Sequence, residues 1–283
     1  MKFFPALTLA ASLLVTINAC STTPKITSQF NTPEISEAEP ADLSSLIAQV
    51  ERESVDGLNF FMSHDEQNLY LTVDFISLRL YQQALEFGFT VFIDHEDGFK
   101  RSFGVTYPTG LYYELGDYPG ARKGYIEEPD WESIPQNISI KESAERNIYQ
   151  RALITQRRNR QQDLSPVPVP LLQLEAQNLR LQSDQDERSG RIHYTIPLET
   201  RSTSQFAPDI QPGETVDLGF EIHPVRLFNL DSGMRAPMLN RQSRSGNTQS
   251  DQDEEIRTHI NLIMRRLLEP YEEWVKVTLE PAD

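Results

Sequence analysis

The sequence predicts a mainly β protein, an antiparallel, jelly-roll-like β-sandwich with about three helices inserted between its strands. Three observations lead to this fold class. About eight segments carry the alternating or near-continuous apolar pattern of a strand. Turn-forming residues separate most of these segments, so neighbouring strands are expected to pair locally, and helical periodicity is confined to short stretches. The alternative is an α+β fold with one large antiparallel sheet.

The first hairpin is predicted between residues 55 and 75. Polar and apolar residues alternate over 68–75, which is the period of a half-buried strand, and 55–62 is the expected partner strand. The polar run 63–67 is the loop between them. Ser77 is then the expected N-cap of a short helix that ends at Gly88, since glycine favours the position after a helix.

Two further strands are predicted on either side of an acidic turn. Residues 89–93 are almost continuously apolar, which predicts a central strand covered on both faces. The chain returns as a strand over 100–107, and Pro108 ends it. Residues 108–135 are rich in glycine and proline and are predicted to form a loop.

The second half contains two predicted helices and the remaining strands. Apolar residues recur every four positions from Ile140 to Ala152, which predicts a helix over about 141–160. Alternating prolines make 166–170 an edge strand or a connector, because proline has no N–H to donate. The other predicted elements are a hairpin of 171–181 with 191–198, a strand at 215–222, a helix at about 253–267 and a closing strand at 271–279.

Composition excludes several classes of protein. The chain has 283 residues, with 42 acidic and 26 basic side chains, and its formal net charge is −16. This charge argues against nucleic acid as a partner, because phosphates repel an acidic surface. A single cysteine excludes an intramolecular disulfide framework and a multi-cysteine metal site. A hydrophobic content of 38% is too high for a wholly disordered chain.

The N-terminus has the pattern of an export signal. Lys2 precedes an apolar stretch over residues 3–17, which has the length of a secretory signal and is short for a membrane span. The run Ile-Asn-Ala-Cys at 17–20 resembles the lipobox of bacterial lipoproteins. The resemblance implies cleavage of residues 1–19 and acylation of Cys20, with Ser21 favouring the outer membrane, on its periplasmic or its surface face. The alternative is an ordinary signal peptide with an incidental cysteine.

Two polar segments are predicted to lie outside the compact fold. Residues 20–41 are rich in Ser, Thr, Pro and Glu and are predicted to be a flexible tether after the lipidated cysteine. A flexible chain of this length spans about 25 Å on average. A single domain is then expected over 42–283, with a mobile loop at about 229–251, where the sequence is rich in Ser and Arg.

Three blocks of sequence carry a resemblance to known proteins. The hairpin at 59–71 resembles that of family 9 carbohydrate-binding modules and of the related DOMON domains. The pair 88–94 and 103–108 and the closing run 274–279 resemble uncharacterised lipoproteins of the Bacteroidetes and Chlorobi groups. The resemblance implies a jelly-roll-like sandwich and non-catalytic binding of carbohydrate or another small ligand. Phe92 departs from it, because tryptophan is common at that position in the lipoproteins.

Aromatic residues in and beside the predicted loop 108–135 are the candidate ligand site. Aromatic faces stack on sugar rings, and tyrosine adds a hydroxyl at a small entropic cost. The alternative is that the loop folds back and covers the core. The candidates are Tyr107, Tyr112, Tyr113, Tyr118, Tyr125 and Trp131.

Two charged groups are weaker candidates. Asp94, Glu96 and Asp97 place carboxylates in one turn, and carboxylate oxygens are ligands that Ca²⁺ prefers. The alternative is a solvated turn, and no other cofactor is expected. The predicted helix at 141–160 is rich in cations, which suggests docking of an acidic protein partner or lipid headgroups through Arg151, Arg157 and Arg158. The alternative is a solvated helix face.

Three functions follow from these observations. The first is a membrane-anchored, non-catalytic lipoprotein that binds a glycan or a small ligand. The second is a structural or assembly lipoprotein that binds a protein partner in the cell envelope. A hydrolase ranks third, because the sequence has no G-x-S-x-G, phosphate-binding loop or H-E-x-x-H motif.

Overall fold

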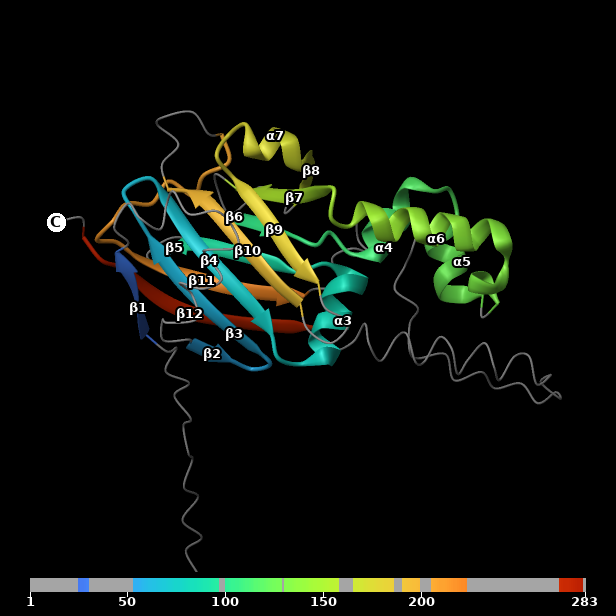
Figure 1. Ribbon diagram of the computed structural model, residues 1–283, viewed down its shortest axis with the longest axis horizontal. Coiled ribbons are helices and arrows are strands. Elements are labelled where there is room, and N and C mark those ends of the chain that lie inside the picture. The colour runs from blue at the N-terminus through green and yellow to red at the C-terminus, as the bar shows by residue number, and fades with distance from the viewer. Residues whose placement is uncertain are drawn as a thin grey trace, which may run out of the picture.

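A computed structural model describes residues 25–30, 53–96, 100–128, 130–157, 165–185, 190–198, 205–222 and 270–281. In this part of the chain, two largely antiparallel sheets pack face to face, with helices at one end and along one edge (Figure 1). The predicted fold class, a mainly β sandwich with inserted helices, is confirmed. Within the described ranges, no helix is long and apolar enough to cross a membrane.

In each sheet, most adjacent strands are consecutive in the sequence and antiparallel. The strand order of the first sheet is β8 (Val167–Pro170), β7 (Arg151–Gln156), β6 (Phe103–Thr106), β5 (Thr90–His95), β11 (Thr215–Ile222) and β12 (Tyr271–Leu279). The order of the second sheet is β3 (Leu58–His64), β4 (Asn68–Phe75), β10 (Gly190–Pro197) and β9 (Arg180–Gln185), with β2 (Glu53–Val55) paired to β3.

Strand β1 (Lys25–Phe30) joins the two sheets at one edge of the sandwich. It runs parallel to β12, with Lys25 opposite Lys276, and parallel to β3, with Phe30 opposite His64. The prediction that all of 20–41 is a tether is therefore wrong for residues 25–30. The local composition is polar, but two unpaired strand edges supply backbone hydrogen bonds that no local pattern reveals.

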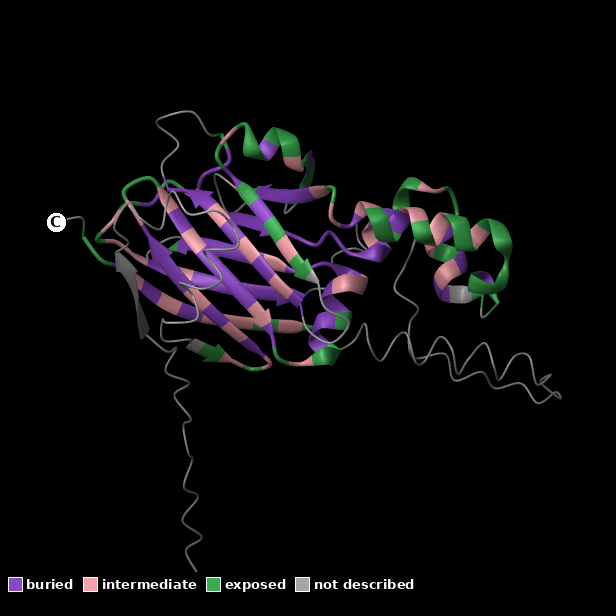
Figure 2. Ribbon diagram, in the orientation of Figure 1, coloured by how far each residue is buried: buried purple, intermediate pink, exposed green. Residues whose placement is uncertain are grey.

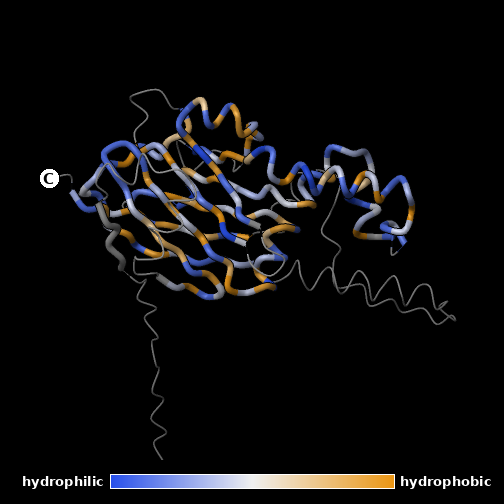
Figure 3. The backbone as a smooth tube through the Cα atoms, viewed as in Figure 1, coloured by the Kyte–Doolittle hydropathy of each residue, from blue (hydrophilic) through white to orange (hydrophobic). Residues whose placement is uncertain are grey.

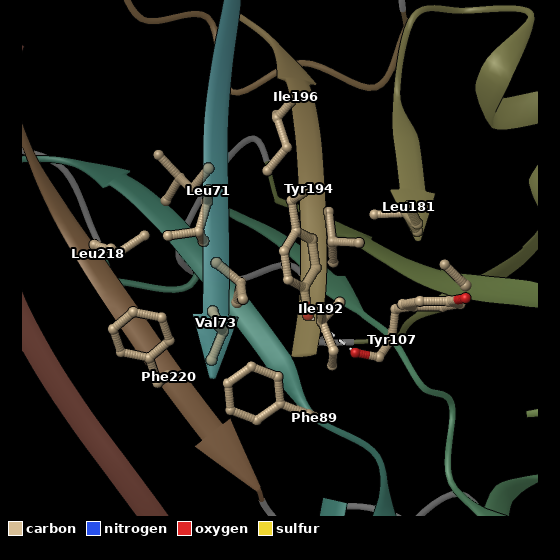
Figure 4. Packing of buried hydrophobic residues seen from close by; sticks show 14 of the residues in the cluster. Leu71, Val73, Phe89, Tyr107, Leu181, Ile192, Tyr194, Ile196, Leu218 and Phe220 are labelled. Atoms are coloured by element: carbon tan, nitrogen blue, oxygen red, sulfur yellow. Dashed lines mark hydrogen bonds between the residues drawn. The ribbon is translucent and has the colours of Figure 1, made fainter. Parts of the chain in front are cut away.

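The core lies between the two sheets, where alternate residues of each strand point inward. Figure 3 shows the resulting alternation of hydropathy along the strands, and Figure 2 shows the buried positions. In Figure 4, side chains from β4 and β10 of one sheet meet those of β11 and Phe89. The rings of Phe60 and Phe220 join the sheets with centroids 5.1 Å apart.

The predicted first hairpin and the helix after it are both confirmed. β3 and β4 pair antiparallel, and the Asp65 carboxylate accepts hydrogen bonds from the backbone N–H groups of Gln67 and Asn68 in the turn. Helix α3 (Leu78–Phe87) begins after Ser77, whose hydroxyl accepts a hydrogen bond from the Leu80 N–H, and ends at Gly88 with φ 86°.

The segment predicted as a loop at 108–135 is largely helical instead. It contains α4 (Leu111–Glu114), the 3₁₀ turn η1 (Leu115–Asp117), α5 (Ala121–Glu127) and the 3₁₀ turn η2 (Trp131–Ser133), and α6 (Pro135–Asn147) follows. The glycines and prolines that suggested a loop flank these short helices. Gly110 and Gly120 precede α4 and α5 with positive φ angles of 90° and 78°, and Pro135 begins α6. We call α4 to α6 the helical insert.

The single helix predicted over 141–160 is also wrong. Helix α6 ends at Asn147, and Arg151–Gln156 form strand β7 between β6 and β8. Residues 152–155 are all buried, which a strand covered on both faces allows. The apolar spacing of four residues continues past the end of α6 into β7 by coincidence. Pairing of β7 with β6 and β8, rather than this local spacing, makes Arg151–Gln156 a strand.

The remaining elements follow the predictions in part. β8 is an edge strand, as its prolines predicted, and β11 and β12 lie where strands were predicted. The segment 171–181 begins as helix α7 (Leu171–Glu175) before β9 pairs with β10 as the predicted second hairpin. The predicted signal peptide, Cys20, the loop 229–251 and the helix at 253–267 lie outside the described residues.

Candidate functional site

Three of the six predicted aromatic ligand residues are core residues. Tyr107, Tyr112 and Trp131 are exposed by 3%, 1% and 4%. Tyr107 packs edge-on against Tyr149, and burial raises the pKa of Tyr107 to about 12. Trp131 belongs to a separate small core inside the helical insert. These three rings present no face to solvent, so for them the structure supports the alternative that the segment covers the core.

The other three tyrosines are partly buried against the same cores. Tyr113 packs on the main core, with the Arg122 and Arg151 guanidinium groups 5.8 Å and 5.5 Å from its ring centroid. Tyr118 and Tyr125 pack on the core of the helical insert. The six residues therefore do not form one continuous stacking surface.

Arg151 holds the helical insert onto the first sheet. Its Nε and Nη2 donate to the Glu114 carboxylate at 3.1 Å and 2.5 Å, and Nη2 also lies 2.5 Å from Asp117 Oδ2. Glu114 is fully buried and also accepts from the Thr109 hydroxyl. These carboxylates raise the pKa of Arg151. The group predicted to bind a protein partner is thus engaged within the fold.

The other two predicted partner residues do not share a helix with Arg151. The backbone N–H of Arg157, just beyond the end of β7, donates to the Ser102 carbonyl at 2.7 Å. Arg158 lies outside the described residues. The predicted basic helix face is therefore wrong, because Arg151 belongs to a strand and Arg157 lies at its end.

The described carboxylates of the predicted acidic turn contact different partners and do not converge. Asp94 is 1% exposed and accepts hydrogen bonds from the backbone of 101–103 and from the Ser102 hydroxyl. Glu96 accepts from Lys276 Nζ at 2.7 Å, and Asp97 lies outside the described residues. Within the described ranges, no three acidic, histidine or cysteine side chains gather as a metal site would require.

The outer face of the first sheet carries an aromatic pair that sequence analysis did not select as a site. Val275 and Val277 of β12 are in the core, so Trp274 points to the opposite face. One cross-strand row places Trp274 beside Gly219, Gly219 beside Phe92, and Phe92 beside Gly104. The rings of Trp274 and Phe92 are nearly parallel, at 21°, with centroids 6.1 Å apart.

Two glycines let these rings lie close to the sheet. A Cβ atom on Gly219 would come within 2.6 Å of the Trp274 ring, and one on Gly104 within 2.5 Å of Phe92. One face of the indole is therefore covered by the backbone of β11. Phe92 is only 3% exposed, whereas Trp274 is partly exposed.

A charged rim surrounds the indole. The buried Asp94 holds the 101–103 segment, in which Arg101 has a positive φ of 65°. The Arg101 guanidinium then bridges Glu221 Oε1 at 2.5 Å and Glu272 Oε1 at 2.8 Å. Glu272 in turn accepts from Trp274 Nε1 at 2.8 Å, which fixes the plane of the ring. Burial raises the pKa of Asp94, and the hydrogen bonds from residues 101–103 oppose that shift.

Lys100 completes this group, which we call the Trp274 platform (Phe92, Lys100, Arg101, Glu272 and Trp274). Lys100 Nζ lies 4.5 Å from the centroid of the Trp274 ring. A ligand that stacks on the outward indole face must displace this exposed ammonium, at a cost of about 0.5–1 kcal/mol. The arrangement offers an oriented aromatic face with donors and acceptors beside it, which is the chemistry that recognises a saccharide.

A cleft lies near the start of β12, away from the Trp274 platform. The cleft, of about 270 Å³, is lined by Asp56, Gly57, Ser77, Arg79, Leu80, Gln83, Pro270 and Tyr271. The Tyr271 hydroxyl is buried and has no hydrogen-bond partner among the described residues. Burial, with Glu273 and Asp56 nearby, raises the pKa of Tyr271. Because the hydroxyl is not accessible, it offers no contact to a ligand in the cleft.

A histidine with a hydroxyl and a carboxylate lies on the outer face of the second sheet. His193 Nδ1 is 2.9 Å from the Thr72 hydroxyl, and Nε2 is 3.4 Å from Asp184 Oδ2. Burial lowers the pKa of His193. Thr72 is only 5% exposed, so this trio presents no accessible nucleophile and gives no support to a hydrolase.

Comparison with known proteins identifies structural neighbours but no family. No protein-family model and no curated protein matches the chain. The structure is similar to a family 9 carbohydrate-binding module from Caldicellulosiruptor kristjanssonii in complex with glucose, with a TM-score of 0.30 and 10% identity over 70% of this chain and 78% of that chain. It is also similar to a Bacteroides uniformis protein with a provisional assignment as carbohydrate-binding, with a TM-score of 0.36 and 10% identity over 71% of this chain and 84% of that chain.

Proposed function

We propose that this protein is a non-catalytic carbohydrate-binding lipoprotein that binds a saccharide on the Trp274 platform. One observation carries the proposal. An indole ring lies against the outer face of a β-sheet, with Gly219 on one side, and Trp274 as a whole is partly exposed. The apolar face of a sugar ring stacks on such a surface, because both are flat and apolar.

The charged rim supplies the polar half of the recognition. Arg101 and Glu272 are fixed by their mutual ion pair and by Glu221, so little side-chain entropy is lost when they bind sugar hydroxyls. Lys100 is exposed and can turn from the ring to a hydroxyl. The site thus combines one rigid aromatic anchor with adaptable polar contacts.

Tryptophan fluorescence tests this proposal directly, because the chain has only two tryptophans. In a Trp131→Phe background, Trp274 is the sole emitter. A glycan array selects the probe saccharide, whose titration is expected to change the emission of Trp274. Trp274→Ala is expected to weaken binding by about 30-fold, the loss typical of an aromatic anchor. Trp131→Phe alone is the matched control and retains the affinity.

Two results would overturn the saccharide site. The first is an array with no binder above background for a folded protein. The second is a bound saccharide whose affinity is the same in the Trp274→Ala variant. Unfolding curves of each variant separate loss of the site from loss of the fold.

We further propose that acylation of Cys20 anchors the protein in the outer membrane. The support is the lipobox-like run at 17–20 and the apolar stretch before it. Labelling of cells with an alkyne fatty acid is expected to mark the native chain and not the Cys20→Ala variant. Equal membrane recovery and labelling of both forms would contradict the anchor and leave the saccharide site unaffected.

A further inference from the structure

Strand β1 limits the distance between the fold and the proposed anchor to a shorter value than a tether of twenty residues would allow. We infer that β1 holds the Trp274 platform at the membrane surface, so that its ligand is a saccharide carried on a membrane lipid. This inference rests on the proposed function. It adds the location of the site and the class of its ligand.

The geometric argument begins with the pairing of β1. Its first residues form a parallel ladder with β12, in which Lys25 lies opposite Lys276 and Ser28 opposite Leu279. Its last two residues pair with Ser63 and His64 of β3. The first part of the strand is therefore held by one sheet and its last two residues by the other, which fixes the position of Lys25 on the sandwich.

Only four residues separate Cys20 from Lys25. A fully extended chain advances at most about 3.6 Å per residue, so Lys25 lies within about 18 Å of an acylated Cys20. A flexible tether of twenty residues would reach about 25 Å on average and much more when extended. The fold thus stands close to the bilayer.

The pairing of β1 with β12 also fixes the distance from Lys25 to the Trp274 platform. Trp274 lies two positions before Lys276, the partner of Lys25, and on the neighbouring strand. Two residues along a strand and one strand across add about 7 Å and about 5 Å. Trp274 therefore lies within about 30 Å of the membrane anchor. A saccharide carried on a lipid headgroup lies within this reach of the bilayer, so a platform held there meets membrane-borne sugars at a higher effective concentration than free ones.

Energy transfer from Trp274 to the membrane tests the placement. The full lipidated chain with Trp131→Phe is bound to phosphatidylethanolamine vesicles that contain a dansyl-headgroup lipid. Strong transfer is expected. A variant with a twenty-residue Gly-Ser segment inserted between Thr22 and Thr23 is expected to lose about half or more of the transfer, because the insertion adds about 25 Å. Trp274→Phe in the same background measures the signal from other sources.

A proline in the strand provides a second test. Thr27→Pro removes a donor from β1 and is expected to release the strand and reduce the transfer, while Thr23→Pro, four residues earlier, is the matched control. Equal transfer in the native and inserted chains would overturn the inferred placement, even if Thr27→Pro fails to fold.

The ligand class is tested with vesicles and soluble sugar in parallel. The native and inserted chains are titrated with the saccharide found on the array, either free or as the headgroup of a vesicle lipid. We expect equal affinity for the free sugar and at least about tenfold stronger vesicle capture by the native chain. Failure with the free sugar overturns the proposed function, whereas equal capture by both chains overturns only the inferred membrane-displayed ligand.

Discussion

Removal of the Arg151 side chain is expected to destabilise the protein strongly. In the Arg151→Met variant, the fully buried Glu114 carboxylate keeps, among the described residues, only its hydrogen bond from the Thr109 hydroxyl. Breaking a buried ion pair by removing one partner costs about 3–5 kcal/mol. The Arg151 side chain is 24% exposed, so solvent reaches the site and we expect the lower end, about 3 kcal/mol. This loss reduces the folding equilibrium constant by about a hundredfold.

Urea unfolding followed by circular dichroism measures this change. The midpoint is expected to fall while the slope stays constant, because the same surface becomes exposed on unfolding. Arg146→Met on the exposed side of α6 is the matched control, with an expected change within about 0.5 kcal/mol. The double variant Arg151→Met with Glu114→Leu removes both charges and is expected to recover most of the stability. A loss below about 1 kcal/mol in Arg151→Met would refute the assigned role of this pair.

Three smaller changes test other parts of the structure. Gly219→Ala places a methyl group against the Trp274 ring, and is expected to cost about 1–3 kcal/mol in urea unfolding and to weaken saccharide binding; unchanged affinity would contradict the assigned ring position. Tyr271→Phe removes a buried hydroxyl that has no hydrogen-bond partner in the described part of the chain, and is expected to leave the free energy of unfolding unchanged or raise it by about 1 kcal/mol; a clear loss would show that the hydroxyl has a partner. Burial lowers the pKa of His193, so the unfolded chain takes up the proton first and stability is expected to fall as pH drops below about 6.5. His193→Gln is expected to flatten this dependence in unfolding curves between pH 5 and pH 7, and an identical slope in the variant would contradict it.

The sequence predicted those elements whose structure depends on neighbouring residues. The hairpin of β3 and β4 has its apolar alternation, its turn and its partner strand within one short segment. Helix α3 was equally predictable, because Ser77 and Gly88 mark its two ends. In both cases the interactions that stabilise the element are close in the chain.

The incorrect predictions share a different cause. The spacing of Ile148 and Ala152 fitted a helix, but β7 pairs with β6 and β8, and these partners are not visible in the local pattern. The Trp274 platform was missed for the same reason. The closing strand was predicted, but the direction of Trp274 was not considered, and its neighbour Gly219 lies far away in the sequence. Only the register of β11 and β12 brings the two together.

The position of β1 also constrains the order in which the chain assembles. β1 is synthesised well before its partner β12, from which it is separated by most of the other strands. Contacts between such distant segments form late in folding, because the intervening chain must first be ordered. Until β12 is present, β1 can pair only with β3, and its other edge has no strand to pair with. An unprotected strand edge invites pairing with other chains. A chain interrupted before residue 271 therefore lacks the ladder that closes the sandwich, and its exposed edge makes it prone to aggregation rather than merely less stable.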